Sequence, residues 1–207
     1  RNSSTTVTIE AQNNLLLGAS SLVRGGTIML ISDQANVQVL QPTVGDSLDY
    51  SNGISFNAAH VIDLYKFFNA PDLIEYRAGD YFQFTSGGTT TKLIPTASLT
   101  SKSIIIETGD VISITGTLTA SDYLELNSAR DVVVKGDIVA SDGNIDKVVI
   151  IAKGTLASAS KVDQVVNGVY QTATTTGTGF INIQALGIDS NNFDIRALRD
   201  ININLQD

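Results

Sequence analysis

The sequence has no cysteine, so disulfide cross-links, thiolate metal sites and cysteine-based redox catalysis are all excluded. It has one histidine, His60, which is the sole imidazole available as the base of a serine-type triad. No nucleophile motif of the form G-x-S-x-G accompanies it. We therefore interpret His60 as a residue that is solvated or bonded to a neighbour, and we predict no catalytic residues and no cofactor.

Charged residues are also scarce, at 16% of the chain, and the 13 basic and 21 acidic residues give a net charge of −8. No cluster of Lys and Arg is present that would neutralise a phosphate backbone, so nucleic acid is not an expected partner. Long apolar runs are missing too. The run from Val148 to Ile151 has the length of a strand, whereas about eighteen apolar residues are needed to span a bilayer, so we expect no membrane insertion.

What the sequence does contain is an abundance of Thr, Ser, Asn, Gly, Val and Ile, which is typical of β-structure. Its 207 residues and 43% apolar content are sufficient for a folded core. The first stretch, RNSSTTVTIEAQNN, has neither an initiator Met nor the regions of a signal peptide. We expect the chain to be a piece of something longer.

Three stretches repeat one pattern, in which a short apolar or alternating run is followed by a glycine and a second short run. They are ISITGTLTASD from Ile112, VVVKGDIVASDG from Val132 and VVIIAKGTLASAS from Val148. Their glycines, at positions 116, 136 and 154, are spaced by twenty and then eighteen residues. Each stretch is therefore predicted to be a strand that turns at a glycine into another short strand.

A period of about twenty residues built from strands predicts a solenoid in which each coil of chain forms one rung. Successive rungs pair as parallel strands about 4.8 Å apart, so that equivalent residues stack. We expect Ile114, Val134 and Ile151 to stack inside while Thr, Lys and Ser face water. An antiparallel sandwich of short strands is the alternative, but the repeat in register favours an all-β, right-handed parallel β-helix.

Residues 43–98 interrupt this pattern and hold nine of the chain's thirteen aromatic residues. Within NAAHVIDLYKFFNAP, polar residues recur at every third position, which is helical spacing; Asn57 would be the N-cap and Pro71 would lie just past the end. We predict an inserted aromatic-rich lobe at 43–98 that carries this short helix and packs on the side of the solenoid. Residues 1–42 and 99–207 are expected to form one continuous solenoid.

The stretch GDVISITGTLTASDYLELNSARDVVVKGDIVASDG resembles the coils of filamentous-haemagglutinin-type adhesins, the large right-handed parallel β-helices secreted by the two-partner route in Gram-negative bacteria. The resemblance covers roughly residues 5–41 and 101–207. It implies a long extracellular rod that displays adhesive parts to a host or neighbouring cell surface, with a glycan or a protein as the ligand.

The secretion domain of that family carries Asn-Pro-Asn signatures, whereas this chain has SNGISFN from Ser51, without the proline. The resemblance therefore implies an internal shaft segment whose ends meet flanking coils of the same chain. A self-assembling filament subunit, whose ends meet other copies of itself, is the alternative.

The aromatic-rich segment has two possible roles. A small insertion needs its own core, so the rings can be buried for stability alone. Exposed tyrosines also favour sugar and protein binding. For that second role we predict a ligand or partner face formed by Tyr65, Phe68, Tyr76, Arg77 and Tyr81.

Oxygen-bearing residues alternate in SDGNIDK with the spacing that starts a calcium loop. They are Asp142, Asn144 and Asp146. Lys147 and Lys153 stand where such a loop has a glycine and a closing glutamate, so we interpret the stretch as a turn and keep calcium as the alternative.

Parallel β-helices also include enzymes that degrade polysaccharides with paired carboxylates, as lyases or glycoside hydrolases. The candidate acids for such chemistry are Asp110, Glu125, Asp131, Asp137 and Asp189. We interpret them instead as surface acids that keep a rod soluble.

Overall fold

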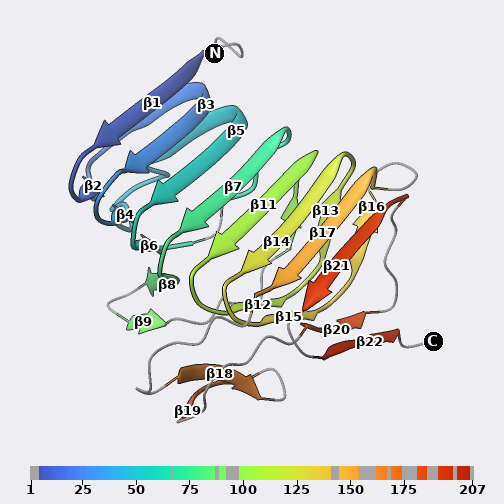
Figure 1. The fold of residues 1–207 in the computed structure, drawn as a ribbon. Coiled ribbons are helices and arrows are strands. Elements are labelled where there is room, and N and C mark those ends of the chain that lie inside the picture. The colour runs from blue at the N-terminus through green and yellow to red at the C-terminus, as the bar shows by residue number, and fades with distance from the viewer. Residues whose placement is uncertain are drawn as a thin grey trace.

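The computed structural model describes residues 5–66, 68–86, 89–91, 98–140, 145–153, 162–166, 169–173, 181–185, 191–197 and 200–205. Every regular element within these ranges is a strand, and the strands stack as a parallel β-solenoid (Figure 1). The predicted all-β parallel β-helix is thereby confirmed. Strands β1 and β22 lie at opposite ends of the stack.

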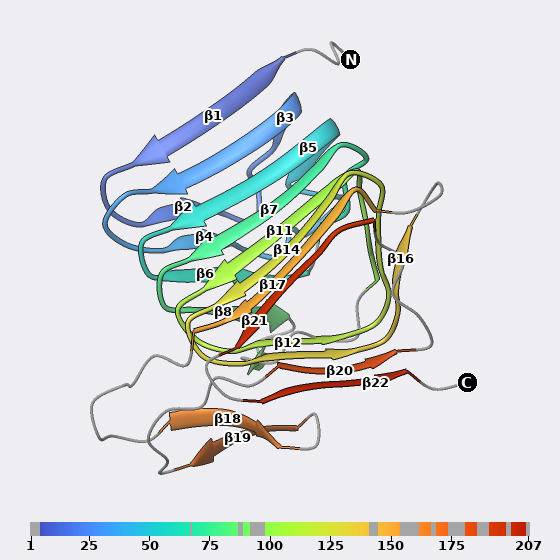
Figure 2. The same ribbon diagram turned by 45° about the vertical axis from the view of Figure 1, so that its right-hand side comes forward.

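The largest layer, which we call sheet A, has eight parallel strands that appear side by side in Figures 1 and 2. In spatial order they are β1 (Thr6–Ala11), β3 (Val23–Ser32), β5 (Leu48–Ala58), β7 (Leu73–Ala78), β11 (Ser103–Thr108), β14 (Tyr123–Ser128), β17 (Lys147–Ala152) and β21 (Phe193–Ala197). Each coil of the chain contributes one strand to this sheet, so sheet A runs the length of the rod.

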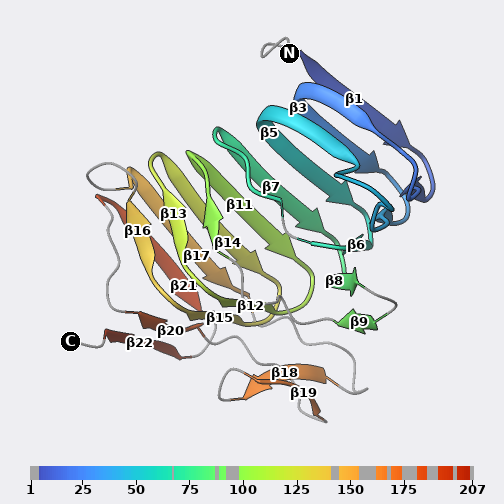
Figure 3. The same ribbon diagram turned by 180° about the vertical axis from the view of Figure 1, so that it is seen from behind.

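The other faces of the rod are shorter sheets. Sheet B follows sheet A in the first coils and contains β2 (Leu15–Leu17), β4 (Val37–Val39), β6 (Val61–Leu64), β8 (Tyr81–Ser86) and the antiparallel β9 (Thr89–Thr91). In the later coils sheet D contains β12 (Ile112–Thr115), β15 (Val132–Lys135), β20 (Ile181–Ala185) and β22 (Ile201–Leu205). Sheet C, visible from behind in Figure 3, contains β10 (Leu99–Thr100), β13 (Leu118–Ala120) and β16 (Ile138–Ala140).

The twenty-residue period appears directly as strand register. Ile104 pairs with Leu124 in sheet A, and Leu118 pairs with Ile138 in sheet C. All four side chains are fully buried, and their neighbours along each strand alternate between the core and the outside. The repeat therefore exists because equivalent apolar residues of successive coils share one continuous core.

The turn glycines have the conformations that the repeat predicts. Gly116 and Gly136 adopt φ angles of 138° and 137°, a region that residues with a Cβ rarely occupy. The two turns also stack closely, because a Cβ added at Gly136 would lie 2.3 Å from the carbonyl oxygen of Gly116. The third predicted turn glycine, Gly154, lies outside the described residues.

The stacking predicted for Ile151 is wrong. Ile114 does pair with Val134, but the next residue in that row is Ile183 of β20. Ile151 belongs to β17 of sheet A, where it pairs with Asn127 and is only half-buried. Between β17 and β20 the chain instead forms an antiparallel hairpin, β18 (Val162–Val166) with β19 (Val169–Ala173), so the third repeat does not continue the row of the first two.

The helix predicted within residues 57–70 is also wrong. Asn57 and Ala58 end β5, and Val61 to Leu64 form β6. The three-residue spacing of polar side chains arises because the chain turns a corner of the rung here: Asn57 and Asp63 face outward from two different strands, with His60 in the turn between them.

The aromatic cluster itself is confirmed. Phe56 and Tyr76 are stacked with ring centroids 5.3 Å apart, and Phe68 packs against Phe56 at 5.6 Å. The cluster lies within the rod, however, because β5 pairs in register with β3 and β7 pairs in register with β11. Strands of segment 43–98 therefore form coils of the same solenoid, and their larger side chains fill its core.

Candidate binding faces of the solenoid

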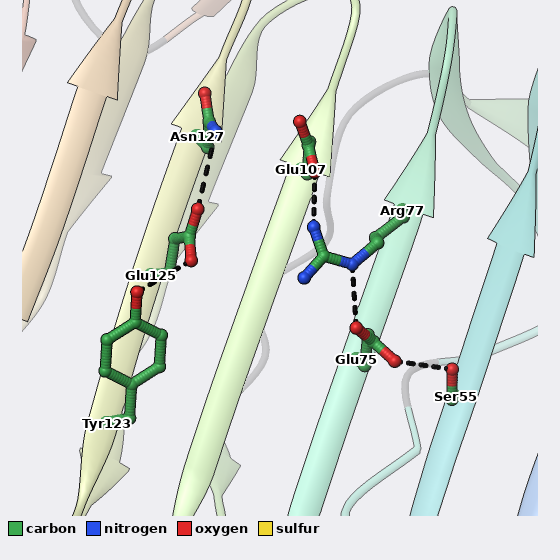
Figure 4. Close-up of polar contacts among 7 residues, drawn as sticks. All are labelled: Ser55, Glu75, Arg77, Glu107, Tyr123, Glu125 and Asn127. Carbon is green, nitrogen blue, oxygen red and sulfur yellow. Dashed lines mark hydrogen bonds and ion pairs between the residues drawn. The ribbon is translucent and has the colours of Figure 1, made fainter.

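The outer face of sheet A carries a charged network centred on Arg77 (Figure 4). The Nε of Arg77 donates to Glu75 Oε1 at 2.7 Å, and its Nη1 donates to Glu107 on the adjacent strand. The other oxygen of Glu75 accepts a hydrogen bond of 2.8 Å from Ser55. Partial burial lowers the pKa of Arg77, but the hydrogen bonds and charges of the two glutamates outweigh it, so the net shift is upward.

A second network lies on β14 of the same face (Figure 4). The Tyr123 hydroxyl donates to Glu125 Oε2 at 2.8 Å, and the Asn127 amide donates to Glu125 Oε1 at 3.4 Å. Desolvation, together with the hydrogen bond and charge of Glu125, raises the pKa of Tyr123 to about 12. Glu75, Glu107 and Glu125 of this face therefore each have a side-chain partner, which makes this part of the face a patterned polar surface.

A pocket of about 310 Å³ adjoins the Arg77 network at the carboxyl ends of β5, β7 and β11. Its charged and polar lining residues are Asn57, Arg77, Glu107, Thr108 and Lys153. Because Glu107 already accepts a hydrogen bond from Arg77, the two cations of this pocket are balanced in part by an internal carboxylate.

A second pocket, of about 340 Å³, lies on the outer face of sheet B. At its centre Asp63 Oδ2 accepts hydrogen bonds from the side-chain amides of Gln38, at 3.0 Å, and Gln83, at 2.8 Å. Asp63 is only 7% exposed, and its Oδ1 has no hydrogen-bond partner among the described residues. The other lining residues are Asn14, Leu15, Leu16, Asn36, Val61 and Tyr81.

Two of the five predicted partner-binding residues are buried. Phe68 is 2% exposed and Tyr76 is 1% exposed. The Tyr76 hydroxyl donates to the Phe68 carbonyl at 3.0 Å and accepts from the Phe68 amide at 2.9 Å. These two residues therefore pack the core, and the interpretation of the aromatic segment as packing holds for them.

The other three predicted residues keep partial exposure but lie in separate settings. Arg77 belongs to the sheet A network, and Tyr81 lines the sheet B pocket. The Tyr65 hydroxyl donates to Asp46 Oδ1 at 2.9 Å, and Lys66 forms an ion pair of 2.7 Å with the same carboxylate. Burial and the bond to Asp46 raise the pKa of Tyr65, while the Lys66 hydrogen bond lowers the pKa of Asp46. Their role in binding stays a prediction.

His60 has a neighbour as its partner, as predicted. Its Nδ1 lies 2.8 Å from Asp80 Oδ2, and both side chains are more than half exposed. An exposed pair of this kind contributes little to stability.

The candidate catalytic acids are distributed over different environments. Asp110 is paired with Arg130 at 2.6 Å in a largely buried setting, and Asp131 is fully buried. Glu125 is held by Tyr123, whereas Asp137 is partly exposed at a turn. Two of these acids are thus interior groups rather than the surface acids we predicted. Asp189 lies outside the described residues.

The calcium alternative falls mostly outside the described part of the chain. Asp142 and Asn144 are not described, and Asp146 is exposed. Across the ranges that the structure describes, no group of three or more His, Cys, Asp and Glu side chains is placed to hold a metal ion. The same ranges include no helix with the length and apolar character needed to cross a membrane.

Comparison with known proteins gives no match to a family model, a curated protein or a solved structure. The strand pairing described above defines the class of protein as a parallel β-solenoid. The narrower resemblance to filamentous haemagglutinin rests on the sequence pattern described above.

The sheet B pocket was missed at the sequence level. Asp63 and Gln83 are twenty residues apart and pair in register, so the period that identified the later coils applies to them too. We did not apply this period to residues 43–98 because we interpreted them as an inserted lobe. An inserted lobe would not pair in register with the coils before it.

Proposed function

We propose that the protein is a shaft segment of a large extracellular, adhesin-like β-solenoid of a Gram-negative bacterium, and that it acts by presenting binding surface to a cell-surface glycan or protein. The observation that carries this proposal is the parallel pairing that continues through all eight strands of sheet A. Stacked coils make a rod on which outward-facing side chains recur along the axis, and such surfaces suit extended contact with a partner.

The last coil of sheet D supports a place within a longer stack. Ile181 and Ile183 are fully buried, but their partners in β22, Ile201 and Ile203, are 48% and 39% exposed. Burial of these two side chains by another layer would be favourable, because it would remove apolar surface from water. We propose that further coils of the same rod provide that layer.

The mass of the native polypeptide tests this proposal. Extraction from the surface of the source bacterium, with detection by an antibody to this chain, should give a polypeptide far larger than 21.9 kDa. Digestion of intact cells with an external protease should remove it, because the rod is proposed to be extracellular. A native chain of about this mass, or one protected in intact cells, would contradict the shaft proposal.

A self-assembling filament subunit is the second candidate, because a second copy would also cover Ile201 and Ile203. Light scattering of the 207-residue chain over a wide concentration range separates the two roles. Growth of long assemblies that Ile203→Lys abolishes, and that Thr115→Lys on the exposed end of β12 leaves intact, would favour the filament. A chain that stays monomeric supports the shaft.

We propose a binding role without a chemical step. Incubation with a panel of polysaccharides should release neither reducing sugar nor unsaturated product. Release that disappears in Glu125→Gln, one of the candidate acids of that alternative, and persists in Asp146→Asn, would instead support the polysaccharide-degrading alternative.

A further inference from the structure

We propose that the pocket on sheet B is a binding site for an uncharged glycan, with Asp63 as its central hydrogen-bond acceptor. This inference rests on the proposed binding role and narrows it to one face and one ligand class. It goes beyond the predicted aromatic face, from which only Tyr81 contributes to this pocket.

The pocket is organised by strand register. Leu16 pairs with Gln38, Gln38 pairs with Asp63, and Asp63 pairs with Gln83. One outward-facing row therefore crosses four coils at a spacing of about 4.8 Å between strands. This spacing is comparable to the length of one pyranose unit, so a glycan chain laid along the row would meet a new side chain at each sugar.

Asp63 is fixed in a way that suits a ligand hydroxyl. The amides of Gln38 and Gln83 both donate to Oδ2 and hold the carboxylate in place. The covered Oδ1 has no hydrogen-bond partner among the described residues, and an unpaired buried acceptor is unfavourable. A sugar hydroxyl that reaches Oδ1 would form a hydrogen bond of the strong, charge-assisted kind.

The remaining lining residues fit the rest of a sugar ring. The apolar and aromatic lining residues include Leu16, which is 56% exposed. They also include Val61 and Tyr81, which pair in register on neighbouring strands. Sugars present C–H faces as well as hydroxyl edges, so apolar and aromatic side chains next to amides match both parts of the ring. The pocket volume of about 340 Å³ is at the lower end of the range for small-molecule sites.

The charge of the lining residues favours neutral glycans over acidic ones. The residues that line the pocket include one carboxylate and no Lys or Arg, and the whole chain carries a net charge of −8. An acidic polysaccharide would be repelled by Asp63 and would find no cation there. A neutral glycan avoids this repulsion and still uses the carboxylate as an acceptor.

The test is calorimetric titration of the 207-residue chain with the neutral hexasaccharides of cellulose, xylan, mannan and amylose, and with hexagalacturonate as the acidic comparison. We expect at least one neutral hexasaccharide to bind and hexagalacturonate not to bind. Asp63→Asn should weaken that binding about tenfold or more, because a hydrogen bond to a charged group is lost. Asp146→Asn, at an exposed carboxylate that lines neither pocket, should leave it unchanged.

A second variant guards against a folding artefact. Leu16→Ala removes an exposed side chain at the end of the row and should also weaken binding while retaining the β-sheet circular dichroism of the parent chain. Binding of no neutral hexasaccharide, preference for hexagalacturonate, or equal affinity in the parent and all three variants would each overturn the inference.

These outcomes are separable from the shaft proposal. A large surface-exposed native polypeptide that binds no neutral hexasaccharide would overturn only the glycan site. A small native chain whose hexasaccharide binding depends on Asp63 would overturn only the shaft.

Discussion

Val134 lies directly beside Ile114 in the neighbouring coil, through the parallel pairing of β12 with β15, and both side chains are buried. The row continues to Ile183 on the other side of Val134. Each of these side chains is therefore enclosed by the equivalent residue of the next coil. Substitutions in such a row affect several coils at once.

Val134→Asp should destabilise the protein by several kcal/mol, because it places a carboxylate between two aliphatic neighbours with no partner. Chemical denaturation followed by circular dichroism measures the loss. Thr115→Asp, at the exposed end of the adjacent strand β12, is the matched control and should change stability little. Equal stabilities of the two variants would mean that the faces of β12 and β15 are assigned wrongly.

Gly136→Ala should also be destabilising. The residue has a φ of 137°, and backbone strain of this type costs about 1–3 kcal/mol. The new Cβ would also lie 2.3 Å from the Gly116 carbonyl oxygen, so the two stacked turns would have to separate. Gly18→Ala is the control, since its nearest new contact would be 3.9 Å away. A melting temperature for Gly136→Ala no lower than that of the control would contradict the stacked turn.

Tyr76→Phe should lower stability by about 1–3 kcal/mol, because the Phe68 amide and carbonyl would both lose their buried partner. The ring stacking with Phe56 would be retained, so the cost reports on the hydroxyl alone. Tyr65→Phe, which removes an exposed bond to Asp46, should cost less than about 1 kcal/mol. A reversed order would show that the aromatic cluster does not depend on this hydroxyl.

Stability should fall at alkaline pH. Burial raises the pKa of Tyr76 well above its ordinary value of 10.0, and burial with the charge of Asp46 raises the pKa of Tyr50 to about 12. Above pH 10 these tyrosines ionise in the unfolded chain but stay protonated in the fold. The unfolded state then binds fewer protons, so the free energy of unfolding decreases by about 1.4 kcal/mol per pH unit for Tyr76.

Below pH 10 the contribution is fully present. Denaturation curves between pH 8 and 12 should therefore show a shallower alkaline loss in Tyr76→Phe than in the parent chain. Parallel curves would mean that Tyr76 ionises equally well in both states.

Arg130→Ala should destabilise the protein by about 3 kcal/mol, because it leaves the Asp110 carboxylate buried without its cation. The side chains of this pair are 10% and 14% exposed. Arg196→Ala is the matched control: its pair with Asp194 has a similar distance of 2.7 Å, but Arg196 is 71% exposed. Its loss should cost less than about 1 kcal/mol. The losses in the free energy of unfolding are measured by urea denaturation. Because the two pairs have similar distances, a larger loss for Arg130→Ala reports the effect of burial.

The sequence by itself determined the fold class and the period. Short-range alternation predicts strands, and the matching flanks of Gly116 and Gly136 predict that successive coils stack. Both inferences are reliable because a solenoid repeats the same local environment in each coil. Equivalent positions in successive coils therefore need similar residues, and the same pattern recurs in the sequence. The pairing of Ile114 with Val134 follows from this repetition alone.

Only the tertiary structure decided which residues share a face where the repeat is irregular. In the run Val148–Ile151 all four residues are apolar, so no alternation marks the inward side, and Ile151 was assigned to the wrong sheet. In NAAHVIDLYKFFNAP the polar residues recur at every third position because the chain turns from β5 into β6, and this spacing resembles that of a helix. The sheet B pocket depends on the register of four coils, with steps of 22, 25 and 20 residues between Leu16, Gln38, Asp63 and Gln83. Contacts across unequal steps are set by loop length and core packing, which local sequence patterns do not encode.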